Sequence, residues 1–99
     1  MITCVIQYTL DPHAIGDFEK YATTWPPIIK RCGGELTGFY LPKEGANDFA
    51  IALIDFESLA AYEQYRARLA ADPDARANVE AVRAARAILA ERRSFLRKV

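Results

Sequence analysis

The sequence predicts an α+β domain in which a four-stranded antiparallel sheet carries its helices on one face. Four stretches are rich in β-branched and aromatic residues and are predicted to be strands: 2–10, 35–41, 49–56 and 88–98. Helical periodicity occupies the chain once between the first two strands and twice before the last. The resulting order, β-α-β-β-α-α-β, is that of a ferredoxin-like fold.

The first strand and the first helix are separated by a short polar signal. In the strand, Ile2, Cys4, Ile6, Tyr8 and Leu10 share one parity, which predicts a face buried against the core. Asp11 offers an N-cap oxygen and Pro12 fits the first helical position, so a helix is expected over about 13–32.

The first predicted helix has one apolar stripe and two prolines in its interior. Its stripe comprises Ile15, Phe18, Ala22, Trp25, Ile29 and Cys32, which recur every three or four residues and are expected to face the sheet. Pro26 and Pro27 lack the amide hydrogens that the helix needs, so a kink or a short break is predicted near Trp25. Gly33-Gly34 is expected to end the helix.

The second half of the chain contains a hairpin, two helices and a basic last strand. The stretch 42–48 is rich in turn formers and connects the second strand to a strongly apolar, central third strand. Ser58 is predicted to cap the next helix, and Asp72-Pro73 to start another. The expected inner positions are Leu59, Tyr62, Tyr65 or Arg66, and Leu69 in the first of these helices, and Val79, Val82 and Ala85 in the second.

Other helix residues are predicted to form a solvated charged face. Pairs three or four residues apart are expected among Arg68, Arg76, Arg83 and Arg86 and the acidic Glu63, Asp72 and Glu80.

Size and composition predict a single domain over residues 1–99 that associates with itself. A chain of this length buries a limited share of its surface, yet 52% of its residues are apolar. The sheet face without helices needs a cover, and a second copy of the chain is the expected one.

Charge and cysteine content exclude several classes. The 13 basic and 13 acidic residues cancel, so neither nucleic acid nor an anionic membrane is an expected partner. No apolar run approaches the length of a membrane span and no leader pattern opens the chain, so a cytoplasmic protein is expected. Cys4 and Cys32 are expected to be buried free thiols, and with His13 as the single histidine neither a metal site nor a cofactor is predicted.

Several blocks of the sequence resemble the NIPSNAP family. They are Tyr8-Thr9-Leu10-Asp11-Pro12, Pro27 before Gly33-Gly34, the Gly38-x-Tyr40-x-Pro42-x-Glu44-Gly45 hairpin, Ser58-Leu59-Ala60-Ala61-Tyr62-Glu63-x-Tyr65-Arg66, Asp72-Pro73 and Arg93-Ser94-Phe95-Leu96-Arg97. Together they cover about residues 3–97.

The resemblance implies a dimeric α/β barrel, in which two four-stranded sheets pack face to face and a cleft lies between each sheet and its helices. Proteins of that superfamily include cofactor-independent monooxygenases, haem-degrading enzymes, haem-binding dismutases and isomerase-like proteins, so the fold does not name a reaction. Where many family members carry an arginine and a histidine, this chain has Ile6 and Ala52, which implies a more apolar pocket.

Five side chains are candidates for a site in such a cleft. Trp25 is expected either to stack on a planar ligand or to be a core residue. Tyr8 and Tyr40 are candidate hydroxyl donors that converge at the outer ends of their strands, or plain wall residues. His13 is a candidate general base or an exposed residue of the first helical turn. Arg93, in the alternating run Glu91-Arg92-Arg93, is a candidate partner for a ligand carboxylate or a member of an inter-subunit salt bridge.

The favoured hypothesis is a homodimer that binds a small apolar or aromatic molecule in the cleft, with Tyr8, Trp25, Tyr40 and Arg93 as ligand-binding residues. One alternative is a cofactor-independent monooxygenase or isomerase acting on an aromatic substrate, in which Tyr8, His13 or Tyr40 handles a proton. Another is a structural dimerisation module. No residue cluster indicates a particular chemistry, so the sequence leaves open whether the protein is an enzyme.

Overall fold

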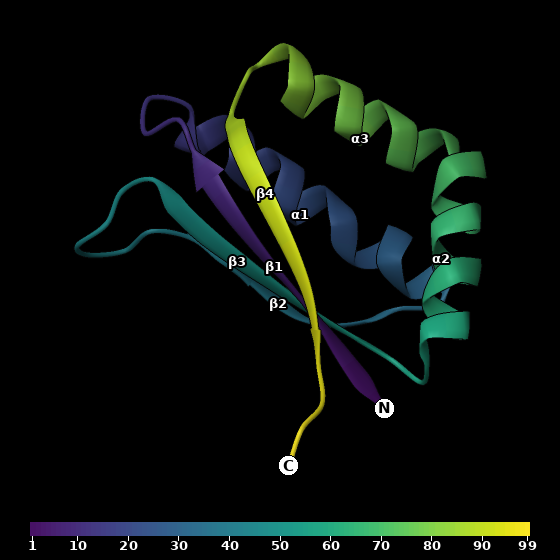
Figure 1. The fold of residues 1–99 in the computed structure, drawn as a ribbon. Helices are drawn as coiled ribbons and strands as arrows, with labels where there is room; N and C mark the ends of the chain where they lie inside the picture. The colour runs from purple at the N-terminus through teal and green to yellow at the C-terminus, as the bar shows by residue number, and fades with distance from the viewer.

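The computed structural model describes all of residues 1–99 and contains one four-stranded sheet with three helices on one face (Figure 1). In chain order the elements are β1 (Ile2–Leu10), α1 (Ile15–Cys32), β2 (Glu35–Tyr40), β3 (Phe49–Phe56), α2 (Leu59–Ala71), α3 (Pro73–Ala84) and β4 (Ile88–Leu96). The strands lie in the order β2-β3-β1-β4 and all neighbours are antiparallel. The predicted α+β, ferredoxin-like fold is confirmed.

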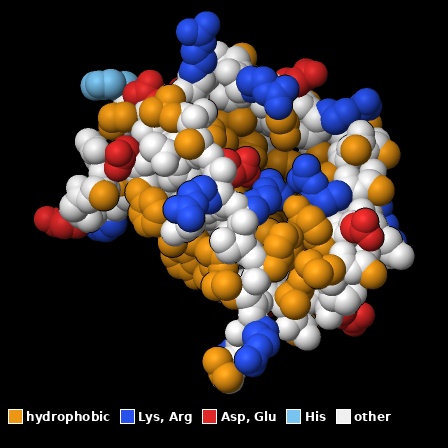
Figure 2. Space-filling model, viewed as in Figure 1, with side chains coloured by type: hydrophobic (Ala, Val, Ile, Leu, Met, Phe, Trp, Pro, Cys, Tyr) orange, Lys and Arg blue, Asp and Glu red, His pale blue; other side chains and the backbone are white.

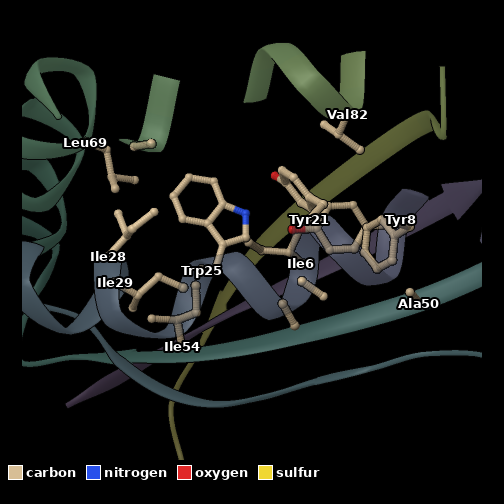
Figure 3. Close-up of a cluster of buried hydrophobic side chains, with 14 of the residues drawn as sticks. Ile6, Tyr8, Tyr21, Trp25, Ile28, Ile29, Ala50, Ile54, Leu69 and Val82 are labelled. Carbon is tan, nitrogen blue, oxygen red and sulfur yellow. The ribbon is translucent and has the colours of Figure 1, made fainter. Parts of the chain in front are cut away.

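The core lies between the sheet and α1. Alternation in the two central strands turns one face toward the helices, and the buried residues on it are Cys4, Ile6, Tyr8 and Leu10 in β1 and Ala50, Ala52, Ile54 and Phe56 in β3. Helix α1 packs against this face with side chains that include Phe18, Trp25 and Ile29, each at most 6% exposed. Figure 3 shows side chains of α1 and of the two central strands meeting in this layer. Both cysteines are buried and free, as expected.

The opposite face of the sheet is apolar at its centre and no element of the chain covers it (Figure 1). Val5 lies opposite Leu53 in the ladder between β1 and β3, and both are only partly buried. Tyr40 and Phe49 on the same face are 54% and 42% exposed. Large apolar side chains therefore face outward on a strand surface that has no helix above it.

Helix α1 differs from its prediction at its start and at its prolines. Asp11 is not the N-cap; its carboxylate instead accepts a 2.9 Å hydrogen bond from the His13 amide, so a turn precedes a helix that begins at Ile15. The helix continues through Pro26 and Pro27, so a short break near Trp25 is absent, and of the two predicted alternatives only a kink remains. Burial of Trp25 and its neighbours against the sheet outweighs the two missing amide donors, because tertiary packing supplies most helix stability.

The end of α1 and the connection from α2 to α3 agree with their predictions. Gly33 ends α1 with φ of 107°, a left-handed conformation that favours glycine. The Ser58 hydroxyl accepts from the Ala61 amide at 3.1 Å, and Asp72 accepts from the amides of Asp74 and Ala75 at 2.9 and 3.1 Å.

Two expectations for the helix surfaces are wrong. Leu59 is 59% exposed, because it is the first residue of α2 and only Tyr65 and Leu69 of that helix are buried. None of the predicted pairs among the arginines and acidic residues of α2 and α3 forms. The ion pairs observed join Arg31 to Asp72 and Asp74, and Arg93 to Glu91.

No helix of the structure has both the length and the apolar character needed to cross a membrane.

Candidate functional site

A cavity of about 390 Å³ lies between the inner face of the sheet and the three helices. Strand residues form its floor, including Ile6, Phe39 and Ile54, and residues of α1, α2 and α3 form its walls. Of the 21 lining residues 15 are hydrophobic, and the seven aromatic ones are Tyr8, Tyr21, Trp25, Phe39, Phe56, Tyr62 and Tyr65. The volume falls within the range of about 300–1,000 Å³ found for small-molecule pockets.

Trp25, Tyr21 and Tyr8 form an aromatic cluster along one side of this cavity. The ring centroids of Tyr21 and Trp25 are 5.5 Å apart and those of Tyr8 and Tyr21 are 6.4 Å apart, both in edge-to-face geometry. Figure 3 shows the indole nitrogen of Trp25 turned toward the tyrosine hydroxyls. Trp25 is only 6% exposed, so it belongs to the core and also lines the cavity.

The tyrosines of this cluster are held in their protonated form. Burial raises the pKa of Tyr8 far above its usual value, and burial likewise raises the pKa of Tyr21. Each hydroxyl therefore keeps its proton at neutral pH and acts as a hydrogen-bond donor. Neither is suited to remove a proton from a substrate.

Arg93 extends into the same cavity from the edge strand β4. The register places it opposite Ile6, on the side of the sheet that carries the helices. Its guanidinium donates to the Tyr62 hydroxyl at 3.0 Å and to the Glu91 carboxylate at 2.9 Å. Although burial disfavours its charge, the bond to Glu91 raises the pKa of Arg93 above its usual value. Arg92 points to the other face, as the predicted alternation requires.

Tyr40 and His13 lie outside the cavity. The pairing of β2 with β3 shifts between Leu36 and Gly38, and this irregularity turns Phe39 inward and leaves Tyr40 on the opposite face. The expectation that Tyr8 and Tyr40 converge is therefore wrong. His13 is exposed in the turn between β1 and α1.

Sequence reasoning missed several residues that line the cavity. Tyr21 had a usable signal, because it lies three residues after Phe18 and four before Trp25 on the same helical stripe. Four charged residues that were expected to be surface or packing residues also line it: Arg66, Arg76, Glu80 and Arg83. Nothing in the local pattern distinguishes these arginines from those of a solvated face.

The cavity therefore combines an apolar interior with hydroxyl and guanidinium donors. Its only carboxylates are Glu80 and Glu91, and the second of these already pairs with Arg93. The structure holds no group of three or more His, Cys, Asp or Glu side chains placed to bind a metal ion. This donor set is suited to holding a ligand with oxygen acceptors.

Comparison with known families and curated proteins gives one match. The NIPSNAP family model matches residues 4–99, which is nearly the whole chain. No curated protein sequence matches this chain.

Solved structures share the fold over the full chain. A NIPSNAP family protein of unknown function from Agrobacterium tumefaciens has 25% identity and a TM-score of 0.86, with 100% of this chain and 88% of that one covered. An uncharacterized NIPSNAP domain protein from Burkholderia xenovorans has 19% identity and a TM-score of 0.84, covering 100% and 95%. SnoaB, a cofactor-independent oxygenase from Streptomyces nogalater, has 16% identity and a TM-score of 0.67, covering 99% and 92%, and shows likeness of fold alone.

Proposed function

The chain belongs to the NIPSNAP family, and from this premise we propose that it forms a homodimer and binds a small apolar or aromatic molecule in the cleft between its sheet and its helices. The observation that carries the proposal is the cavity of about 390 Å³ with 15 hydrophobic residues among its 21. Filling it with an apolar ligand removes aromatic and aliphatic surface from water, which is favourable.

Binding without turnover fits the cavity better than catalysis does. The protonated hydroxyls of Tyr8 and Tyr21 donate hydrogen bonds, and Glu91 is neutralised by Arg93. Glu80, the other carboxylate of the lining, is exposed on α3. His13, the one imidazole of the chain, is too remote to take a proton from a bound molecule, since it lies outside the lining. A carrier or sensor needs no such base.

A second candidate function is a cofactor-independent oxygenase or isomerase acting on an aromatic substrate. The observation favouring it is the cluster of Trp25, Tyr21 and Tyr8, whose donors can stabilise an oxygen that becomes negative in the substrate. An enzyme would turn over its ligand, whereas a carrier would return it unchanged. A purely structural dimerisation module would bind no small molecule.

Self-association is supported by the uncovered face of the sheet. Val5, Ile51 and Leu53 are partly buried there, and Phe49 is 42% exposed. A second copy placed sheet to sheet would bury this surface with the same residues on both sides, as two-fold symmetry requires.

We also assign the protein to the cytoplasm, because the free thiols of Cys4 and Cys32 agree with a reducing compartment.

The sole tryptophan of the chain allows a direct test of the cleft. Trp25 lines the cavity, so a bound acceptor dye is expected to quench its fluorescence by energy transfer. The probe is phenylnaphthylamine, an uncharged aromatic molecule that becomes fluorescent in apolar surroundings. Saturable quenching of Trp25 with matching dye emission supports binding, and native mass spectrometry of the purified protein reports any molecule already bound.

Two alanines of α2 provide a matched pair of variants. Both alanines are exposed on the same helix, but Ala70 lines the cavity and Ala67 does not. Ala70→Phe fills part of the cavity and is expected to weaken dye binding about tenfold, while Ala67→Phe leaves it unchanged. Equal affinities in the two variants would place the dye elsewhere and remove the support for this cleft.

A further inference from the structure

The cavity carries an excess of positive charge at its open side. The whole chain has a formal net charge of zero, yet the lining holds four arginines and two glutamates, an excess of two positive charges: Arg66, Arg76, Arg83 and Arg93 against Glu80 and Glu91. Figure 2 shows basic side chains gathered in the middle of this face, between β4 and the helices α2 and α3, next to hydrophobic ones.

Three of these arginines have no partner within the chain. Arg66, Arg76 and Arg83 take part in none of the ion pairs of the structure and in none of its side-chain hydrogen bonds. Arg76 and Arg83 are seven residues apart on α3, so they lie on one face of the helix, toward the cavity. Their spacing places two free guanidinium groups above the apolar floor.

Arg93 faces them from the other side of the opening. Its bonds to Tyr62 and Glu91 leave the remaining N–H donors of the guanidinium unused. These bonds also fix its position, because they anchor it to α2 and to its own strand. A fixed guanidinium with spare donors suits the planar oxygens of a carboxylate.

We infer that the ligand of this cleft is an amphipathic organic anion, with an apolar or aromatic body on the cavity floor and an oxyanion held at the mouth between Arg93 and the arginines of α2 and α3. This inference rests on the proposed function and adds the charge of the ligand to it. A cationic ligand would be repelled by the excess positive charge, and an uncharged one would leave the free guanidinium donors of the lining without a partner.

The test uses two dyes that share their aromatic rings and differ in charge. Anilinonaphthalene sulfonate carries an anionic group that phenylnaphthylamine lacks, so the ratio of their two dissociation constants isolates the contribution of the anion. Both affinities are measured by quenching of Trp25 in the wild-type protein and in each variant. Comparing ratios between proteins cancels the contribution of the rings.

The variants are Arg93→Gln, the double variant Arg76→Gln with Arg83→Gln, and Arg86→Gln as the matched control. Arg86 follows α3, is exposed and does not line the cavity. The preference for the sulfonate is expected to fall about tenfold in Arg93→Gln and about threefold in the double variant, and to stay unchanged in Arg86→Gln. Unchanged binding of the neutral dye shows that each variant keeps its cleft.

The outcomes separate this inference from the function on which it rests. If both dyes bind and the ratio is the same in every protein, the cleft accepts apolar molecules without regard to charge and the inference fails alone. If neither dye binds the wild-type protein, the proposed function fails as well. Should Arg93→Gln lose its fold by circular dichroism, the double variant on α3 decides the question, because its side chains have no partners to lose.

Discussion

The guanidinium of Arg93 donates a 3.0 Å hydrogen bond to the hydroxyl of Tyr62, and this contact ties the edge strand β4 to helix α2. The same two side chains line the cavity, so the bond also defines one side of its opening. Tyr62 is held in turn by edge-to-face packing on Phe95 and Phe56, with ring centroids 4.7 and 5.2 Å away. The position of Arg93 therefore depends on aromatic packing between β4, β3 and α2.

Removing the Tyr62 hydroxyl is expected to destabilise the fold slightly. Tyr62→Phe keeps the aromatic packing and loses one hydrogen bond to a charged donor, a change of about 1 kcal/mol in the free energy of unfolding. Urea denaturation of Tyr62→Phe, Arg93→Met and the double variant gives the coupling between the two side chains. A coupling energy near zero would show that the contact does not persist in solution.

The cap of α3 is expected to make stability depend on pH in acid. Hydrogen bonding by Arg31, together with the amides of Ala75 and Asp74, lowers the pKa of Asp72 from its usual 3.8 to about 2. Because the folded state holds the carboxylate more strongly than the unfolded chain does, this stabilisation is complete above pH 4. It is lost as the pH falls through about 2.

Asp72→Asn tests this dependence. The variant is expected to be less stable than the wild type at neutral pH, and the difference in the free energy of unfolding should shrink between pH 4 and pH 2. Glu63→Gln serves as the control, since Glu63 is an exposed residue of α2 without an ion pair. A constant difference between wild type and Asp72→Asn over that range would contradict the pKa assigned to Asp72.

The buried tyrosines are expected to make the protein unstable in alkali. Burial raises the pKa of Tyr8, Tyr21 and Tyr65 above the usual value of 10. Their stabilising effect is complete below pH 10 and falls as the pH rises, because the unfolded chain ionises first. Ultraviolet titration of the phenolate should show these three ionising only as the fold is lost, and Tyr8→Phe should make the alkaline loss of stability less steep.

Local patterns predicted the elements well because each has its own signal. The alternation in β1, the Ser58 and Asp72 caps and the glycine at Gly33 depend on interactions within a few residues, and all were confirmed. Trp25 lies on the helical stripe that the sequence predicts and lines the cavity, while its role in binding a ligand stays a prediction.

The parts that sequence could not predict depend on contacts between distant elements. The shift in pairing between Leu36 and Gly38 reverses which face Tyr40 occupies, and its one local sign is the glycine inside the strand, which marks a possible bulge without giving the new register. Arg76 and Arg83 are exposed, and only the placement of α3 over the cavity shows that they also line it. The charge of the candidate site therefore emerges from the tertiary arrangement, and the apolar interior from the sequence.

The uncovered sheet face is expected to hold two copies together. Leu53 lies at the centre of this face, opposite Val5, so Leu53→Glu would place a carboxylate in the interface twice by symmetry. We expect a loss of at least about 3 kcal/mol of association free energy, or about a hundredfold in the dissociation constant. Leu59→Glu is the matched control, because Leu59 is 59% exposed on α2, away from that face.

Sedimentation is the measurement. Wild type and Leu59→Glu should sediment with twice the chain mass of 11.1 kDa. Leu53→Glu, checked for folding by circular dichroism, should sediment as a single chain. A wild-type protein that sediments as one chain at all concentrations would refute the homodimer, whereas a Leu53→Glu variant that remains dimeric would place the interface on another surface.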